Sequence, residues 1–153
     1  MEFIYKNNTL SIESEKKSIE ITPEALILDG MRVDMAGEYE KGGFLLYVHR
    51  ENGVLISHFR AEGYWIVSIP TVISDISGEL LESLGNVDVL IMPGSKSLIP
   101  ILEKFEPRLL VTYWESAHEL ALSLSVTEPP VMKYKMKEAD LSSEKTWCVI
   151  MWE

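Results

Sequence analysis

Few residues of this chain have side chains suited to chemistry, and they are widely spaced. The sequence has three histidines and one cysteine in 153 residues. His49 and His58 are expected at the ends of two strands joined by a turn at residues 51–53, so their imidazoles could approach each other. A metal ion needs further ligands at about 2 Å, and Glu51 or Glu62 would have to supply them. We therefore favour the simpler interpretation of two polar residues near a turn.

Nucleophilic catalysis has little support either. Residues 87–97 resemble the strand and turn of class I glutamine-amidotransferase-like domains, but Cys148 lies in the expected last strand and not on a strand-to-helix elbow. A serine hydrolase needs His and Asp partners. No histidine is persuasively placed near the four candidate hydroxyls, and we assign His118 no role. These hydroxyl residues are Ser68, Thr71, Ser74 and Ser77.

The segment from Gly94 to Ser97 offers a weaker possibility. Its backbone N–H groups, together with Lys96, could receive an anion. The glycine-rich spacing of a phosphate-binding loop is missing, however. We therefore interpret residues 93–94 as the end of a strand, and Ser95 or Ser97 as the cap of the next helix.

Composition narrows the class of protein. A hydrophobic fraction of 46% and a charged fraction of 25% are typical of a globular protein, and we expect one domain over residues 1–153. The formal net charge of −10, with no basic cluster, argues against nucleic acid as a partner. No apolar run is long enough to cross a bilayer, and no signal peptide is evident. With a single cysteine, a cytoplasmic location is the simplest expectation.

The N-terminal half predicts a β-meander. Short runs rich in isoleucine, valine and aromatic residues are separated by turn signals such as Asp29-Gly30 and Asn52-Gly53. The expected strands cover residues 3–5, 9–13, 18–22, 25–29, 31–35, 43–49, 53–59 and 64–68.

The C-terminal half alternates strand and helix. Ser77, Ser97 and Ser116 begin three expected helices, in which apolar residues recur three and four positions apart. The expected strands cover residues 87–92, 109–113, 131–136 and 147–152. The last strand is apolar on both faces and must be covered on both sides. This requirement favours an α/β (α+β) protein with a four-layer αββα sandwich, reduced in size.

Three segments resemble short metallo-β-lactamase-fold proteins related to bacterial L-ascorbate-6-phosphate lactonase. Residues 33–40, Val-Asp-Met-Ala-Gly-Glu-Tyr-Glu, are similar to the family's Asp-Gly-Pro-Gly-Glu-Tyr-Glu turn, with Met35-Ala36 in place of Gly-Pro. Residues 63–94 follow the family's strand, loop, helix and Val-Asp-Val-Leu strand. Residues 132–141 and the last strand are similar to its C-terminal end. The resemblance implies a metallo-β-lactamase fold over most of the chain beyond residue 31.

The departures from the family pattern are at its metal ligands. The family's His-x-His-x-Asp-His loop is absent, and Ser68, Thr71 and Trp114 stand where the resemblance places later His, Asp and His ligands. Hydroxyls and an indole do not bind a transition metal in this way, so no activated water is expected. We expect neither a cofactor nor the family's hydrolysis. The former cleft, which could bind a small ligand, would contain Ser68, Thr71, Ser95, Trp114 and Glu115.

Three hypotheses follow. The first is a non-catalytic metallo-β-lactamase-fold protein that binds another protein or itself. The second is a metal-dependent hydrolase with ligands relocated to His49, His58 and nearby carboxylates. The third is a small-ligand-binding protein that uses the former cleft. We rank the first highest, because a scaffold retained without its ligands is typical of binding or assembly.

Overall fold

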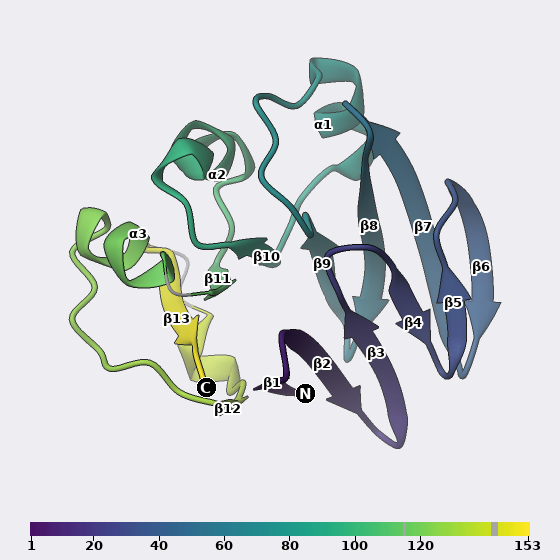
Figure 1. Ribbon diagram of the computed structural model, residues 1–153, viewed down its shortest axis with the longest axis horizontal. Helices are drawn as coiled ribbons and strands as arrows, with labels where there is room; N and C mark the ends of the chain where they lie inside the picture. The colour runs from purple at the N-terminus through teal and green to yellow at the C-terminus, as the bar shows by residue number, and fades with distance from the viewer. Residues whose placement is uncertain (115, 142–143) are drawn as a thin grey trace.

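Two β-sheets stacked on one another form the body of the molecule (Figure 1). The computed structural model describes residues 1–114, 116–141 and 144–153. Within them, a six-stranded sheet has the order β12-β1-β2-β3-β4-β5, and all its neighbouring pairs are antiparallel. Its strands are β1 (Glu2–Lys6), β2 (Thr9–Ser14), β3 (Lys17–Ile21), β4 (Leu26–Leu28), β5 (Met31–Val33) and β12 (Lys133–Lys135).

The second sheet has seven strands in the described part of the chain, in the order β13-β11-β10-β9-β8-β7-β6. Strands β6 to β9 continue the antiparallel meander, whereas β9, β10, β11 and β13 are parallel neighbours. The strands are β6 (Gly37–Lys41), β7 (Phe44–Glu51), β8 (Val54–Ala61), β9 (Tyr64–Ser68), β10 (Val89–Pro93), β11 (Leu109–Tyr113) and β13 (Trp147–Met151).

Strand β6 is a correction to the sequence prediction, which took the Glu-Tyr-Glu segment as a turn. Residues Gly37–Lys41 instead pair with β7 through a tight hairpin. Gly42 and Gly43 form its turn with φ values of 60° and 81°. Two consecutive positive φ angles are what a two-residue hairpin turn needs, and glycine adopts them without strain. The turn therefore lies at Gly42 and Gly43, after the Glu-Tyr-Glu segment and not within it.

Three helices follow the predicted positions closely: α1 (Gly78–Leu84), α2 (Ile99–Phe105) and α3 (Ala117–Ser123). The Ser77 hydroxyl caps α1 by accepting from the Leu80 N–H at 3.2 Å. Before α2, Ser95 rather than Ser97 is the cap of a 3₁₀ turn, η1 (Lys96–Leu98). A second 3₁₀ turn, η2, covers Glu138–Asp140. No helix of the described residues is long and apolar enough to cross a membrane.

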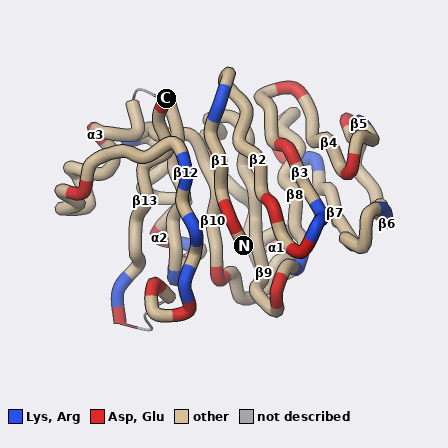
Figure 2. The backbone as a smooth tube through the Cα atoms, turned by 90° about the horizontal axis from the view of Figure 1, so that it is seen from below, with Lys and Arg blue, Asp and Glu red and all other residues tan. Residues whose placement is uncertain are grey.

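The predicted combination of stacked sheets and helices is confirmed, but only one helical layer is present in the described residues. All three α-helices pack on the seven-stranded sheet. The outer face of the six-stranded sheet carries polar side chains such as Ser11, Glu13 and Glu20, and Figure 2 shows charged residues along β1, β2, β3 and β12. A polar face gains nothing from a covering helix, so the layers are β, β and α.

The core consists of two apolar clusters, one on each face of the seven-stranded sheet. One lies between the sheets and the other lies under the helices. Strand β13 contributes to both, with Val149 and Met151 in the first and Cys148 and Ile150 in the second. The prediction that the last strand is covered on both sides is therefore confirmed.

Candidate functional site

Four of the five predicted cleft residues lie at one edge of the seven-stranded sheet. Strands β9, β10 and β11 are parallel neighbours, so their carboxyl ends meet there. Ser68 ends β9, Ser95 follows β10 and Trp114 follows β11. Thr71 lies three residues after Ser68. The fifth residue, Glu115, lies outside the described residues.

These four residues do not share one cavity. Ser68 and Thr71 line a hollow of about 290 Å³ that also contacts residues of the six-stranded sheet. Trp114 instead lines two other hollows, of about 580 Å³ and 250 Å³, and Trp152 lines both of them as well. Ser95 lines none of the three. The cleft predicted from the sequence is therefore divided.

Aromatic side chains fill the space between these hollows. The Tyr113 ring stacks on Tyr5 with centroids 5.9 Å apart and meets Trp114 edge to face at 5.4 Å. The Tyr113 hydroxyl donates to the Pro70 carbonyl at 3.3 Å, next to Thr71. Burial raises the pKa of Tyr113 well above its usual range. We name Tyr5, Tyr113 and Trp114 the aromatic plug.

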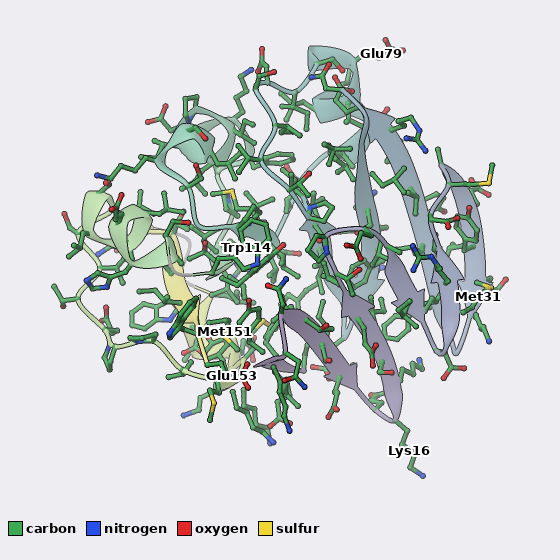
Figure 3. All side chains as sticks on the ribbon, in the orientation of Figure 1. Lys16, Met31, Glu79, Trp114, Met151 and Glu153 are labelled. Atoms are coloured by element: carbon green, nitrogen blue, oxygen red, sulfur yellow. The ribbon has the colours of Figure 1, made fainter. Side chains whose placement is uncertain are left out.

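The backbone at Trp114 is strained. Its φ angle is 77°, in the left-handed region that bulky residues rarely adopt. Such backbone costs of order 1–3 kcal/mol and persists only where the surroundings impose it. Here the indole N–H donates to the Asn8 side-chain oxygen at 2.9 Å. Trp114 is partly buried, and it lines one hollow with Glu153, which is labelled below it in Figure 3. The arrangement supports a packing role.

Two buried serine hydroxyls face each other across β8 and β9. Ser57 and Ser68 are register partners, with 0% and 1% of their surfaces exposed, and neither Oγ has a hydrogen-bond partner among the described residues. A buried polar group without a partner costs about 1–3 kcal/mol. Sequence reasoning selected Ser68 from the resemblance but missed Ser57, because only the strand register brings the two together.

His49 and His58 do lie near each other, on the helix-side face of β7 and β8. Tyr47 pairs with His58, and His49 pairs with Ile56, so the two histidines are diagonal neighbours. His58 is buried and its ring lies 4.6 Å from the Trp65 ring. Its Nε2 atom has no hydrogen-bond partner in the part of the chain that the structure describes. Among the described residues, no group of three or more His, Cys, Asp or Glu could hold a metal ion.

The burial of His58 makes the stability of the fold sensitive to acid. Burial, together with the nearby His49, lowers the pKa of His58 below its ordinary value of about 6.5. The unfolded chain then binds the proton more readily, so stability present above about pH 6.5 is lost as the pH falls toward the folded-state pKa.

We therefore expect His58→Gln to lose less stability than the wild type between about pH 7.5 and about pH 5. Urea unfolding monitored by tryptophan fluorescence measures the difference. Equal acid losses in the wild type and His58→Gln would show that His58 does not govern this behaviour.

Cys148 is unsuited to nucleophilic catalysis. Its side chain is buried on the helix side of β13. Burial, together with the nearby Glu128, raises the pKa of the thiol to about 12. The reactive thiolate is therefore scarce at neutral pH.

Comparison with solved structures identifies the fold. The chain matches the crystal structure of a Thermotoga maritima protein of the metallo-β-lactamase superfamily, named there as a candidate Zn-dependent hydrolase. The match covers 99% of this chain and 98% of that chain, with a TM-score of 0.73 and 14% sequence identity. The fold is metallo-β-lactamase-like. No protein-family model matches the chain, and no curated protein matches it.

At the three positions where the sequence resemblance places later metal ligands, this chain has Ser68, Thr71 and Trp114. Zinc binds imidazole, thiolate and carboxylate groups. Ser68 and Thr71 supply neutral hydroxyls, and Trp114 supplies an indole N–H that already donates to Asn8. The residues present do not fit a metal ion, so we derive no chemical step through one.

Proposed function

We propose that this chain is a non-catalytic protein of metallo-β-lactamase fold that acts by binding another protein, in the first instance a second copy of itself. The chain would be a degenerate relative of the short lactonase-like proteins that its sequence resembles. The observation that carries the proposal is the aromatic plug. Trp114 stands where the sequence resemblance places a metal ligand, and its strained backbone and its hydrogen bond to Asn8 support a packing role.

A surface suited to assembly lies beside the plug. Trp114, His118, Pro130 and Trp152 line one hollow, and Met132 lies next to Val131, whose carbonyl accepts from the Trp152 N–H at 3.1 Å. We call Trp114, His118, Pro130, Met132 and Trp152 the C-terminal apolar patch. Met132 is 57% exposed and Trp152 is 41% exposed. Exposed apolar side chains that gather in this way are typical of protein interfaces.

The charge of the chain restricts how two copies could meet. With a formal net charge of −10, most surfaces of one copy repel those of another. The C-terminal apolar patch has no Asp, Glu, Lys or Arg among its five residues. Contact between two such patches avoids this repulsion, and a two-fold axis would place each patch on its counterpart.

Metal content tests the non-catalytic part of the proposal. The chain, purified without a histidine tag and dialysed after incubation with zinc or manganese, should retain far less than one ion per chain in elemental analysis. Neither ion should raise the melting temperature, because only binding to the folded state does so. One tightly held ion per chain, together with phosphodiesterase or lactonase activity, would refute the proposal.

Sedimentation velocity tests the assembly. We expect the wild type to form a dimer at concentrations of tens of micromolar, and Trp152→Glu to be monomeric, because a buried carboxylate without a partner is unfavourable. Val72→Glu is the matched control, since Val72 is 49% exposed and lies outside the patch. A wild type that stays monomeric throughout, or a Trp152→Glu variant that dimerises normally, would contradict self-assembly through this surface.

A further inference from the structure

We propose that the hollow containing Ser68 is a binding site for a small organic monoanion, a carboxylate with an apolar body and a hydroxyl group. This inference goes beyond the proposed assembly, because it concerns a different part of the molecule and a different class of ligand. We call this cavity of about 290 Å³ the inter-sheet hollow.

The inter-sheet hollow lies where segments distant in the sequence converge. The turn after β3, the hairpin between β7 and β8, and the residues after β9 all line it. It therefore has a wall from each sheet, and much of its lining is apolar. The apolar lining includes Ile21, Pro23, Leu26, Val54, Leu55 and Pro70. A small apolar cavity with a few polar groups is typical of ligand sites.

Ser68 supplies an unused hydrogen-bonding group in this lining. Its side chain is 99% buried by area, since only 1% is exposed, and its Oγ has no partner among the described residues. Folding normally gives such a group a partner. Because the Oγ has less than 1 Å² of exposed surface, a hydroxyl or carboxylate oxygen of a ligand in the hollow would provide one after the Ser68 side chain turns toward it. The buried Ser57 hydroxyl also lacks a partner among the described residues, but Ser57 does not line the hollow. It therefore serves as a control for the effect of an unpartnered hydroxyl alone.

Arg50 supplies an unused positive charge at the same place. Its exposed side chain lines the hollow and makes no ion pair or hydrogen bond with any described residue. Asp34 also lines the hollow, but its carboxylate lies 3.3 Å from the Arg32 Nε. A guanidinium with free N–H groups binds a carboxylate through two parallel hydrogen bonds.

The remaining charges limit the ligand to a monoanion. Glu24 lines the hollow as well, so a second negative charge on the ligand would face repulsion from this carboxylate and from the acidic chain. The Thr22 hydroxyl is already engaged, since it donates to the Ala25 carbonyl at 2.9 Å. Arg50 and Ser68 are therefore the two groups that we expect to recognise the ligand.

The test uses 2-hydroxyisocaproate, which combines a carboxylate, a hydroxyl and a branched apolar tail. Calorimetry on chelator-treated protein should show saturable binding, with much weaker binding of the neutral amide and of isoamylamine. Arg50→Gln should weaken binding at least about tenfold, as expected for the loss of a charged hydrogen bond. Arg60→Gln removes an exposed arginine outside the hollow and should bind as the wild type does.

The serine variants give a second, independent signature. Without ligand, Ser68→Ala and Ser57→Ala should both raise the melting temperature, by about 2 to 4 °C each, because each removes a buried hydroxyl that has no partner. Only Ser68→Ala should also weaken binding of 2-hydroxyisocaproate. A variant that becomes more stable while it loses binding would identify Ser68 as a residue of the binding site.

Three results would overturn the inference. They are no saturable binding by the wild type up to tens of millimolar, stronger binding of the amine than of the carboxylate, or a lower melting temperature for Ser68→Ala. Metal content is measured separately, so uptake of zinc would defeat the proposed function without deciding this inference. A failure of 2-hydroxyisocaproate to bind would likewise leave the proposed function intact.

Discussion

Gly94→Ala is expected to lower the free energy of unfolding by about 3 kcal/mol or more. A Cβ atom at Gly94 would lie 2.0 Å from the Ala117 Cα and 2.2 Å from its backbone nitrogen. Backbone atoms cannot rotate away as a side chain can. The Gly94 N–H donates to the Tyr113 carbonyl at 2.8 Å, and the Ser116 hydroxyl donates to the Gly94 carbonyl. Moving either segment would therefore break contacts that join β10, β11 and the start of α3.

Urea unfolding measures this effect, and Gly78→Ala is the matched control. Gly78 begins α1, and nothing lies within 4 Å of a Cβ built there. Alanine also favours the helix and restricts the unfolded chain, so Gly78→Ala should be neutral or stabilising by up to about 1 kcal/mol. If Gly94→Ala unfolded at the same urea concentration as Gly78→Ala, the close packing of α3 on the end of β10 would be wrong.

Tyr113→Ala is expected to destabilise the fold by about 3–5 kcal/mol, as for other large-to-small changes at buried aromatic residues. Tyr113 is only 4% exposed and belongs to the cluster between the sheets. Its loss removes the ring contacts with Tyr5 and Trp114 and leaves a cavity between the hollows.

Tyr113→Phe separates packing from hydrogen bonding. It keeps the ring and removes only the hydroxyl that donates to Pro70. We expect a loss of about 1 kcal/mol, the usual net value of one hydrogen bond. Chemical denaturation of both variants gives the comparison. A loss below about 1 kcal/mol for Tyr113→Ala would show that the aromatic plug does not support the fold, and the packing role of Trp114 would then lose its basis.

Local signals in the sequence were sufficient for most secondary structure. The turns at residues 29–30 and 52–53, the Ser77 cap and the apolar spacing in α1 to α3 act between residues a few positions apart. The two-sided burial of β13 could be predicted as well, because a strand that is apolar on both faces must be covered on both. These features depend on the turn and helix propensities of individual residues and on the spacing of apolar residues, and both can be read directly from the sequence.

The resemblance singled out Ser68, Thr71 and Trp114, and parallel pairing of β9, β10 and β11 brings the ends of their strands to one sheet edge. It did not show that Tyr113 separates Trp114 from Ser68, since a ring's position depends on partners such as Tyr5, 108 residues earlier in the chain. The number of helical layers could likewise not be predicted from the local sequence pattern. It depends on which sheet face the helices reach.

The sequence by itself determined where most strands, turns and helices form, and which residue types stand where the resemblance places metal ligands. Only the tertiary structure decided that Ser57 opposes Ser68, that neither hydroxyl has a partner among the described residues, and that Arg50 shares a hollow with Ser68. The physical reason is that these relations arise between side chains on different strands. Their distances are set by strand register and sheet stacking, which no single segment encodes.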